Sequence, residues 1–132
     1  MINRILLILI TSYSFIVYSQ DSKKPNIIMM IGDGMGISQI SSSMYSSNNY
    51  TPLERSEFIG LIKTHSLDNL VTDSAASGTA LSSGVKTYNG VLGLDENYNP
   101  VKSILEISRD NGYMTAILVT STIVHATPAA YY

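Results

Sequence analysis

The chain has 132 residues, enough for one domain at most, and its net charge of −2 gives no reason to expect a polyanionic partner such as nucleic acid. It has no cysteine, which excludes disulfides, a thiolate nucleophile and a thiolate metal site. Any metal ion must therefore be held by oxygen and imidazole ligands, and the chain has only two histidines, His65 and His125.

Residues 1–19 differ in character from the rest of the chain. A short positive start that includes Arg4 precedes the apolar run Ile5–Val17, and small or β-branched residues follow it. This pattern predicts a secretory signal peptide that is cleaved before Gln20, and hence a periplasmic or secreted protein. An uncleaved membrane anchor is the alternative, but the run is shorter than the roughly 20 residues of a membrane span.

The first candidate strand is Asn26–Ile31, a continuous apolar run typical of a buried parallel strand. Three glycines in the next five residues, 32–36, predict a tight turn. Asp33 therefore follows the carboxyl end of a strand, the edge at which open α/β sheets bind ligands. A Gly-Asp-Gly turn without chemistry is the alternative interpretation of this residue.

A helix and a second strand are predicted next. Ile37–Ser46 has apolar residues at helical spacing, and Phe58–Lys63 is typical of a short strand. The connector Thr64–Leu70 contains His65, which has no partner nearby at ligand spacing. We expect His65 to be structural or to face solvent.

Val71–Leu81 places one acid, Asp73, directly before one hydroxyl, Ser74, with small residues after them. The stretch predicts a strand or loop end that turns into a helix, with Ser74 in the first turn and the helix ending at Gly84. A hydroxyl at this place faces free backbone N–H groups and the positive end of the helix dipole, where phosphate is stabilised. Asp and Ser are also ordinary helix caps, so the pair by itself does not establish a site.

The rest of the chain continues the alternation of strands and helices. An Asn-Gly turn lies within Thr87–Leu94, a helix is predicted over Val101–Asp110, and Tyr113–Val119 reads as a third strand. His125 and Thr127 follow the end of that strand. The alternation predicts an α/β fold with a mostly parallel sheet.

Four of these residues carry the groups of a possible metal site, and the predicted sheet brings them to one edge: Asp33, Ser74, His125 and Thr127. A carboxylate, an imidazole and hydroxyls suit Mg²⁺ and Zn²⁺. A serine hydroxyl is a poor nucleophile until it is activated, and a bound metal can activate it without a histidine base. Together these features predict a metal-activated serine nucleophile.

The segments that contain these residues resemble those of the alkaline phosphatase family. Asn26–Gly36 is similar to the family's first metal-binding strand end, and Val71–Leu81 to the segment that carries its phosphorylated serine. Gly84–Gly93 continues the match, and Val119–Ala130 is similar to the magnesium-binding segment. Gly-Asp-Gly recurs in related phosphotransferases, whereas the long block Asp73–Gly93 is highly specific.

The resemblance implies an alkaline phosphatase-like three-layer sandwich with a mostly parallel central sheet, of which only the N-terminal part is present. Residues 20–132 would be the N-terminal portion of the catalytic domain. The implied activity is hydrolysis of small phosphate monoesters through a phosphoserine intermediate, with Zn²⁺ and Mg²⁺ as cofactors. The family is often dimeric, so a homodimer is one expectation for the full-length protein.

The resemblance also implies a role for each site residue. Ser74 would be the nucleophile beside a zinc ion, and Asp33 would bridge a zinc ion and the magnesium ion. His125 and Thr127 would lie at the magnesium site, and Asp73 would help to orient a phosphate-binding arginine. Some members carry aspartate in place of His125. An imidazole in place of a carboxylate removes one negative charge and favours softer metals than Mg²⁺. The assignment of magnesium to this site is therefore weaker than the assignment of zinc to the site beside Ser74.

A two-zinc site needs several histidines and carboxylates, which His125 and Asp33 cannot supply alone, and the last residue, Tyr132, lies in an apolar run. We therefore expect an N-terminal fragment of a longer protein that is inactive and poorly folded alone. One alternative is a phosphodiesterase, sulfatase or phosphomutase on the same scaffold, against which the block Asp73–Gly93 argues. The other is a truncated secreted protein that binds phosphate or metal without turnover.

Overall fold

The computed structural model describes residues 25–47 and 50–132. The predicted signal peptide and its cleavage before Gln20 lie outside the described residues. The chain divides into two units, Met1–Ile31 and Gly32–Tyr132. No helix among the described residues combines the length and the apolar character needed to cross a membrane.

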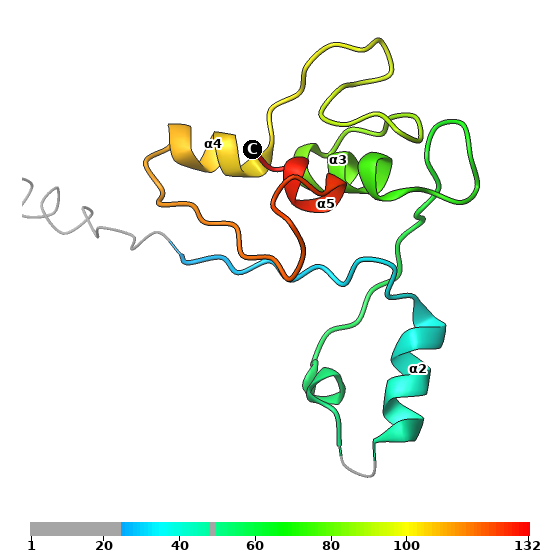
Figure 1. Ribbon diagram of the computed structural model, residues 1–132. Coiled ribbons are helices and arrows are strands. Elements are labelled where there is room, and N and C mark those ends of the chain that lie inside the picture. The colour runs from blue at the N-terminus through cyan, green and yellow to red at the C-terminus, as the bar shows by residue number, and fades with distance from the viewer. Residues whose placement is uncertain (1–24, 48–49) are drawn as a thin grey trace, which may run out of the picture. The chain divides into compact units, whose positions relative to one another are not determined.

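All the regular elements described are helical, and they lie in the unit Gly32–Tyr132 (Figure 1). The elements are α2 (Ile37–Ser46), the 3₁₀ helix η1 (Pro52–Arg55), α3 (Ser74–Ser83), α4 (Ile104–Asp110) and α5 (Ala126–Ala129). Helix α3 packs against both α4 and α5. Buried apolar side chains come from α3, from α5 and from the residues after α5, and they are Ala75, Ala76, Pro128, Ala130 and Tyr131.

The helices predicted from the sequence are present, and their ends follow local capping rules. Helix α2 has the predicted bounds, and α3 begins at Ser74 and ends before Gly84, whose φ of 75° favours glycine. Helix α4 begins at Ile104 rather than at Val101, because Ser103 caps it. The Ser103 hydroxyl accepts a hydrogen bond from the Glu106 N–H (3.2 Å), and the Glu106 carboxylate accepts one from the Ser103 N–H (2.8 Å).

The three segments predicted as strands form no strand in the described part of the chain. Asn26–Ile31, Phe58–Lys63 and Tyr113–Val119 have no regular secondary structure, and the β-pairing described is one isolated antiparallel bridge between Leu94 and Pro100. Most of their large apolar side chains are exposed, including Ile28 at 87%, Phe58 at 91% and Leu118 at 94%. A strand needs a neighbour for its backbone groups and cover for its faces. The predicted sheet therefore stays a prediction.

The packing of α3 on α5 depends on a buried glycine. A Cβ on Gly78 would lie 3.1 Å from the Cβ of Ala130 and 3.6 Å from the Cα of Thr127. The missing side chain lets the two helix backbones approach closely, and Figure 1 shows α3 and α5 side by side. This contact brings the start of α5, which carries Thr127, against the helix that begins at Ser74.

Candidate active site

Three of the predicted site residues meet at one carboxylate. The Ser74 hydroxyl lies 3.2 Å from both oxygens of Asp33, and the Thr127 hydroxyl donates a 2.5 Å hydrogen bond to Oδ2 of Asp33. These contacts join residues that are 41 and 94 positions apart in the chain. Asp33 is exposed, and Ser74 and Thr127 are partly exposed, so a ligand in solution can reach all three groups.

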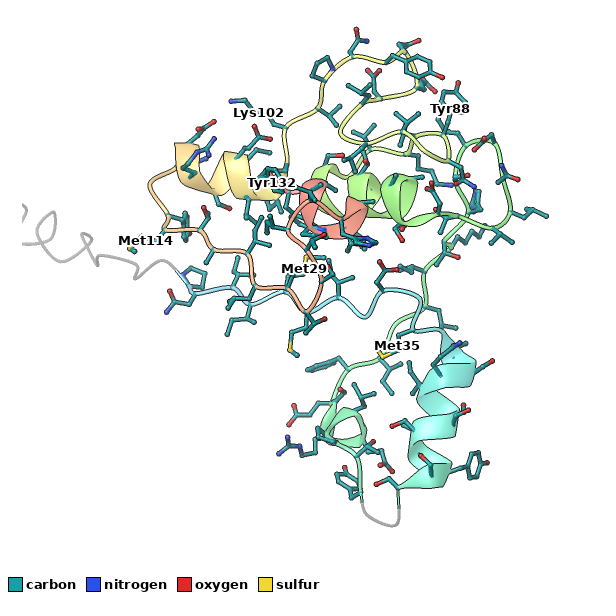
Figure 2. The ribbon with its side chains drawn as sticks, in the orientation of Figure 1. Met29, Met35, Tyr88, Lys102, Met114 and Tyr132 are labelled. Atoms are coloured by element: carbon teal, nitrogen blue, oxygen red, sulfur yellow. The ribbon has the colours of Figure 1, made fainter. Side chains whose placement is uncertain are left out.

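The position of Asp33 follows from the tight turn around it. The Met35 N–H donates to the Gly32 carbonyl (3.2 Å), and Gly34 has a φ of +69°. The Met35 side chain (labelled in Figure 2) folds back on Gly32, where a Cβ would lie 2.6 Å from its terminal carbon. Glycine at both positions thus allows a turn that leaves Asp33 at its tip.

Ser74 is placed by the residue before it. One oxygen of Asp73 accepts a hydrogen bond from the Ala76 N–H (2.9 Å), which caps α3, and the other accepts one from the Gly90 N–H (2.6 Å). The Asp73 carbonyl accepts a hydrogen bond from the Ser77 hydroxyl (2.7 Å). The resemblance assigned Asp73 to orienting an arginine. In this structure both of its oxygens already accept backbone hydrogen bonds.

Thr127 and His125 both belong to the start of α5, but only Thr127 reaches the carboxylate. His125 is the N-cap residue, and its backbone N–H donates to the Thr122 carbonyl (3.1 Å). Its exposed imidazole makes no hydrogen bond to the part of the chain that the structure describes. His65 is exposed, as expected for a residue outside the site.

The converging groups are oxygen donors of the kind that bind hard divalent cations. They comprise the Asp33 carboxylate and the hydroxyls of Ser74 and Thr127. Within residues 25–47 and 50–132, no group of three or more His, Cys, Asp and Glu side chains could by itself hold a metal ion. The donor set therefore fits part of a metal site, and further ligands are needed to complete one.

The Asn-Gly turn predicted from the sequence lies next to the site, and its hydrogen bonds to the segment before Ser74 were not predicted. The Asn89 side chain contacts the backbone of Val71 and Asp73 directly before Ser74. The Asn89 N–H and the Ser66 hydroxyl both donate hydrogen bonds to the Asp68 carboxylate. These bonds lower the pKa of Asp68 from its ordinary 3.8, and the bond from Asn89 has the larger effect. The turn signal was visible in the sequence, but the partners of its side chain were not.

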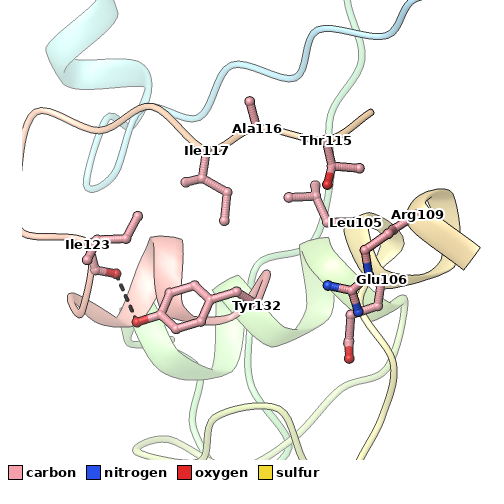
Figure 3. Close-up of a pocket in the computed structure, with 8 residues that line it drawn as sticks. All are labelled: Leu105, Glu106, Arg109, Thr115, Ala116, Ile117, Ile123 and Tyr132. Atoms are coloured by element: carbon pink, nitrogen blue, oxygen red, sulfur yellow. Dashed lines mark hydrogen bonds between the residues drawn. The ribbon is translucent and has the colours of Figure 1, made fainter. Parts of the chain in front are cut away.

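A pocket of about 330 Å³ lies apart from this group of oxygens (Figure 3). It is lined by Leu105, Glu106, Arg109, Thr115, Ala116, Ile117, Ile123 and Tyr132. The Tyr132 hydroxyl donates to the Ile123 carbonyl (3.2 Å), and the lining is mainly apolar. It includes none of the four predicted site residues, so the candidate active site is the surface around Asp33.

Known proteins resemble this chain over most of its length. A family profile described as "Alkaline phosphatase" matches residues 24–132. The chain is 46% identical to alkaline phosphatase 4 of Bacillus subtilis over 80% of its own length and 25% of that protein. It is 38% identical to the repressible alkaline phosphatase of Saccharomyces cerevisiae over 89% of its length and 22% of that protein. The chain thus spans about a quarter of the length of these curated relatives.

Solved structures give the same likeness. The alkaline phosphatase of the Antarctic bacterium TAB5 matches with a TM-score of 0.73 and 47% identity, over 76% of this chain and 29% of that one. Two variants of the TAB5 enzyme, in which a histidine is replaced by glutamate or by aspartate, contain magnesium in their M3 site. Both variants match this chain with a TM-score of 0.73 and 46% identity.

Proposed function

Because the chain belongs to the alkaline phosphatase family, we propose that the complete protein containing it hydrolyses phosphate monoesters, with Ser74 as the nucleophile. The observation that carries the proposal is the position of the Ser74 hydroxyl, at the first residue of α3 and 3.2 Å from both oxygens of Asp33. A serine nucleophile that has no histidine base needs another group to orient its hydroxyl, and the Asp33 carboxylate is such a group. The substrates would be small phosphomonoesters.

Ser74 performs the first step of the proposed reaction. Its oxygen attacks phosphorus, an O–P bond forms, and the bond from phosphorus to the leaving oxygen breaks. The hydroxyl proton passes to solvent, and the leaving oxygen takes up a proton to depart as the alcohol. Asp33 accepts the Ser74 hydrogen bond and so orients the hydroxyl for attack. The phosphoryl oxygens then lie at the positive end of α3, which stabilises an anion. Water next displaces Ser74 from phosphorus, which releases inorganic phosphate and regenerates the hydroxyl.

The oxygen donors also support a divalent cation requirement. We assign Asp33 and Ser74 to a zinc site, and Asp33, Thr127 and His125 to a second site for magnesium or zinc. When bound, these cations would lower the pKa of the Ser74 hydroxyl and neutralise phosphate charge. The support is the convergence of Ser74 and Thr127 on one carboxylate, together with the magnesium in the TAB5 variants. The remaining ligands would come from residues outside this chain.

The fold of the family explains the exposed apolar segments. We propose that Asn26–Ile31, Phe58–Lys63 and Tyr113–Val119 become strands of a mostly parallel central sheet in a three-layer sandwich. Their exposed Ile, Leu, Met and Phe side chains support this, because such surface is stable in water only when other residues cover it. Residues outside this chain would supply the other strands.

Export and assembly are part of the same proposal. Residues 1–19 would direct the protein to the periplasm or out of the cell, and the mature chain would begin at Gln20. The full-length protein would act as a homodimer. Mass spectrometry of the N-terminal peptide from exported protein tests the cleavage, and light scattering of the purified protein tests the dimer.

The test uses the complete protein and three chromogenic substrates: p-nitrophenyl phosphate, bis-p-nitrophenyl phosphate and p-nitrophenyl sulfate. We expect turnover of the monoester to exceed that of the other two. Radiolabelled phosphate trapped at low pH should mark Ser74, and the Ser74→Ala variant should lose both the label and most turnover while its metal content stays near normal. A labelled Ser74→Ala variant, or preference for the diester or the sulfate, would overturn the proposal. Phosphate binding without turnover would indicate a binding protein.

A further inference from the structure

Asn89 has no role in the proposed chemistry, yet its side chain contacts the backbone directly before the nucleophile. Its Oδ1 accepts a hydrogen bond from the Asp73 N–H (3.1 Å), and its Nδ2 donates one to the Val71 carbonyl (3.0 Å). The side-chain amide thus pairs with a donor and an acceptor on either side of Thr72, as a neighbouring strand would. These two bonds set the direction in which the chain enters α3.

The turn that carries Asn89 is held to the same place by a second residue. The Val91 N–H donates to the Tyr88 carbonyl (3.1 Å), and Gly90 has a φ of +82°, which closes a four-residue turn. The Gly90 N–H then donates to the Asp73 carboxylate (2.6 Å), whose other oxygen caps α3. Side-chain and backbone groups of the turn therefore contact Asp73 together.

The turn is itself supported from both sides. The Asn89 N–H donates to Oδ1 of Asp68 (3.1 Å), which also accepts a hydrogen bond from the buried Ser66 hydroxyl (2.9 Å). On the other side, the rings of Tyr88 (labelled in Figure 2) and Tyr98 stack with their centroids 5.8 Å apart. Because these contacts already order the turn, little further conformational entropy is lost when Asn89 and Gly90 hydrogen-bond to the segment before Ser74.

From these contacts we infer that Asn89 is a positioning residue, which holds the backbone at Val71 and Asp73 so that the Ser74 hydroxyl points at the Asp33 carboxylate. Asn89 does not touch the phosphoryl group. The inference rests on the proposed function, because it needs Ser74 as the nucleophile. Reactions of oriented groups are sensitive to small displacements, so loosening this backbone should slow phosphoryl transfer more than it weakens substrate binding.

Two variants of the complete protein test the inference. Asn89→Ala removes both side-chain bonds, whereas Asn89→Asp removes only the donor to Val71 and keeps the turn, since Asp-Gly is also a favoured turn pair. We expect the rate of Ser74 phosphorylation to fall roughly tenfold in Asn89→Asp, which corresponds to the loss of about one hydrogen bond, and to fall further in Asn89→Ala, which loses both. KM and metal content should stay within about twofold of the wild type, as for a change in orientation.

The control is Asn99→Ala. Asn99 is also a turn asparagine whose Nδ2 donates to an aspartate, Asp95 (3.2 Å), but its side chain has no bond to the segment before Ser74. It should keep wild-type kinetics. Hydrogen exchange gives a readout that needs no activity: amides of residues 71–77 should exchange faster in both Asn89 variants and at the wild-type rate in the control.

The outcomes separate this inference from the proposed function. If the wild-type protein is labelled on Ser74 and both Asn89 variants are labelled equally fast, the role of Asn89 is overturned and the proposed function stands. If phosphorylation falls only in proportion to lost metal or lost folded protein, Asn89 is structural and the inference is also overturned. If the wild-type protein is never labelled on Ser74, the proposed function fails, and this role fails with it.

Discussion

Replacing Thr127 by valine removes one hydroxyl from the site and almost nothing else. Valine has the shape of threonine, so the packing of α5 on Gly78 should persist, while Asp33 loses the 2.5 Å hydrogen bond from the Thr127 hydroxyl. Hydrogen bonds to charged groups contribute about 1.5–3 kcal/mol. Because Asp33 is exposed, the lower end applies, and about 1.5 kcal/mol corresponds to roughly a tenfold loss of rate.

The assay is steady-state hydrolysis of p-nitrophenyl phosphate by the complete protein over a series of magnesium concentrations. We expect kcat/KM of Thr127→Val to fall roughly tenfold and the magnesium concentration for half-maximal activity to rise. Thr127→Ser keeps the hydroxyl and should retain most of the activity. Thr122→Val is the matched control, because Thr122 precedes the same helix and is exposed, and its carbonyl bond to the His125 N–H does not involve the side chain.

Two results would refute this reasoning. If Thr127→Val has wild-type kinetics at every magnesium concentration, the bond to Asp33 has no part in catalysis. If Thr127→Ser is as impaired as Thr127→Val, the methyl group rather than the hydroxyl is what the site needs. Similar melting temperatures for the variants and the Thr122→Val control would show that any loss arises at the site.

Two further predictions concern charge. His125→Asp adds a carboxylate beside Thr127, so the affinity for magnesium measured by calorimetry should rise, and an unchanged affinity would place His125 outside the metal site. Asp68 has a pKa lowered from 3.8 in the folded protein, mainly by the Asn89 N–H. Its charged form therefore stabilises the fold above about pH 4, and this contribution is lost as the pH falls through the folded pKa. In denaturant titrations of the complete protein between pH 5 and 2, Asp68→Asn should lose less stability than the wild type, and parallel curves would contradict the assignment.

Local sequence rules determined the helices of this protein. Asp73 as a cap and Gly84 at the end of α3 are consequences of short-range geometry, so they could be identified without knowing what surrounds them. The same rules place Ser74 in the first turn, because a cap and the helix it begins are adjacent in the chain. The start of α4 was misplaced by three residues, since the pattern of apolar residues does not show that Ser103 is the cap.

Strands and long-range contacts could not be determined in this way. Asn26–Ile31 has the composition of a buried strand, but a strand forms only when residues far away in the sequence supply its neighbours, and none do so among the described residues. The hydrogen-bond partners of the Asn89 side-chain amide could not be predicted either, because an Asn-Gly turn pattern does not indicate which distant backbone groups the side chain contacts.

The sequence alone identified the chemical groups of the site, because it gives the residue types and their neighbours in the chain. These groups are a carboxylate, two hydroxyls and an imidazole. Only the tertiary structure decided that Ser74 and Thr127 lie on the same carboxylate while the His125 imidazole does not. The physical reason is that the packing of α3 on α5 across Gly78, and the turn that holds Asp33, depend on contacts between distant segments, which no local pattern encodes.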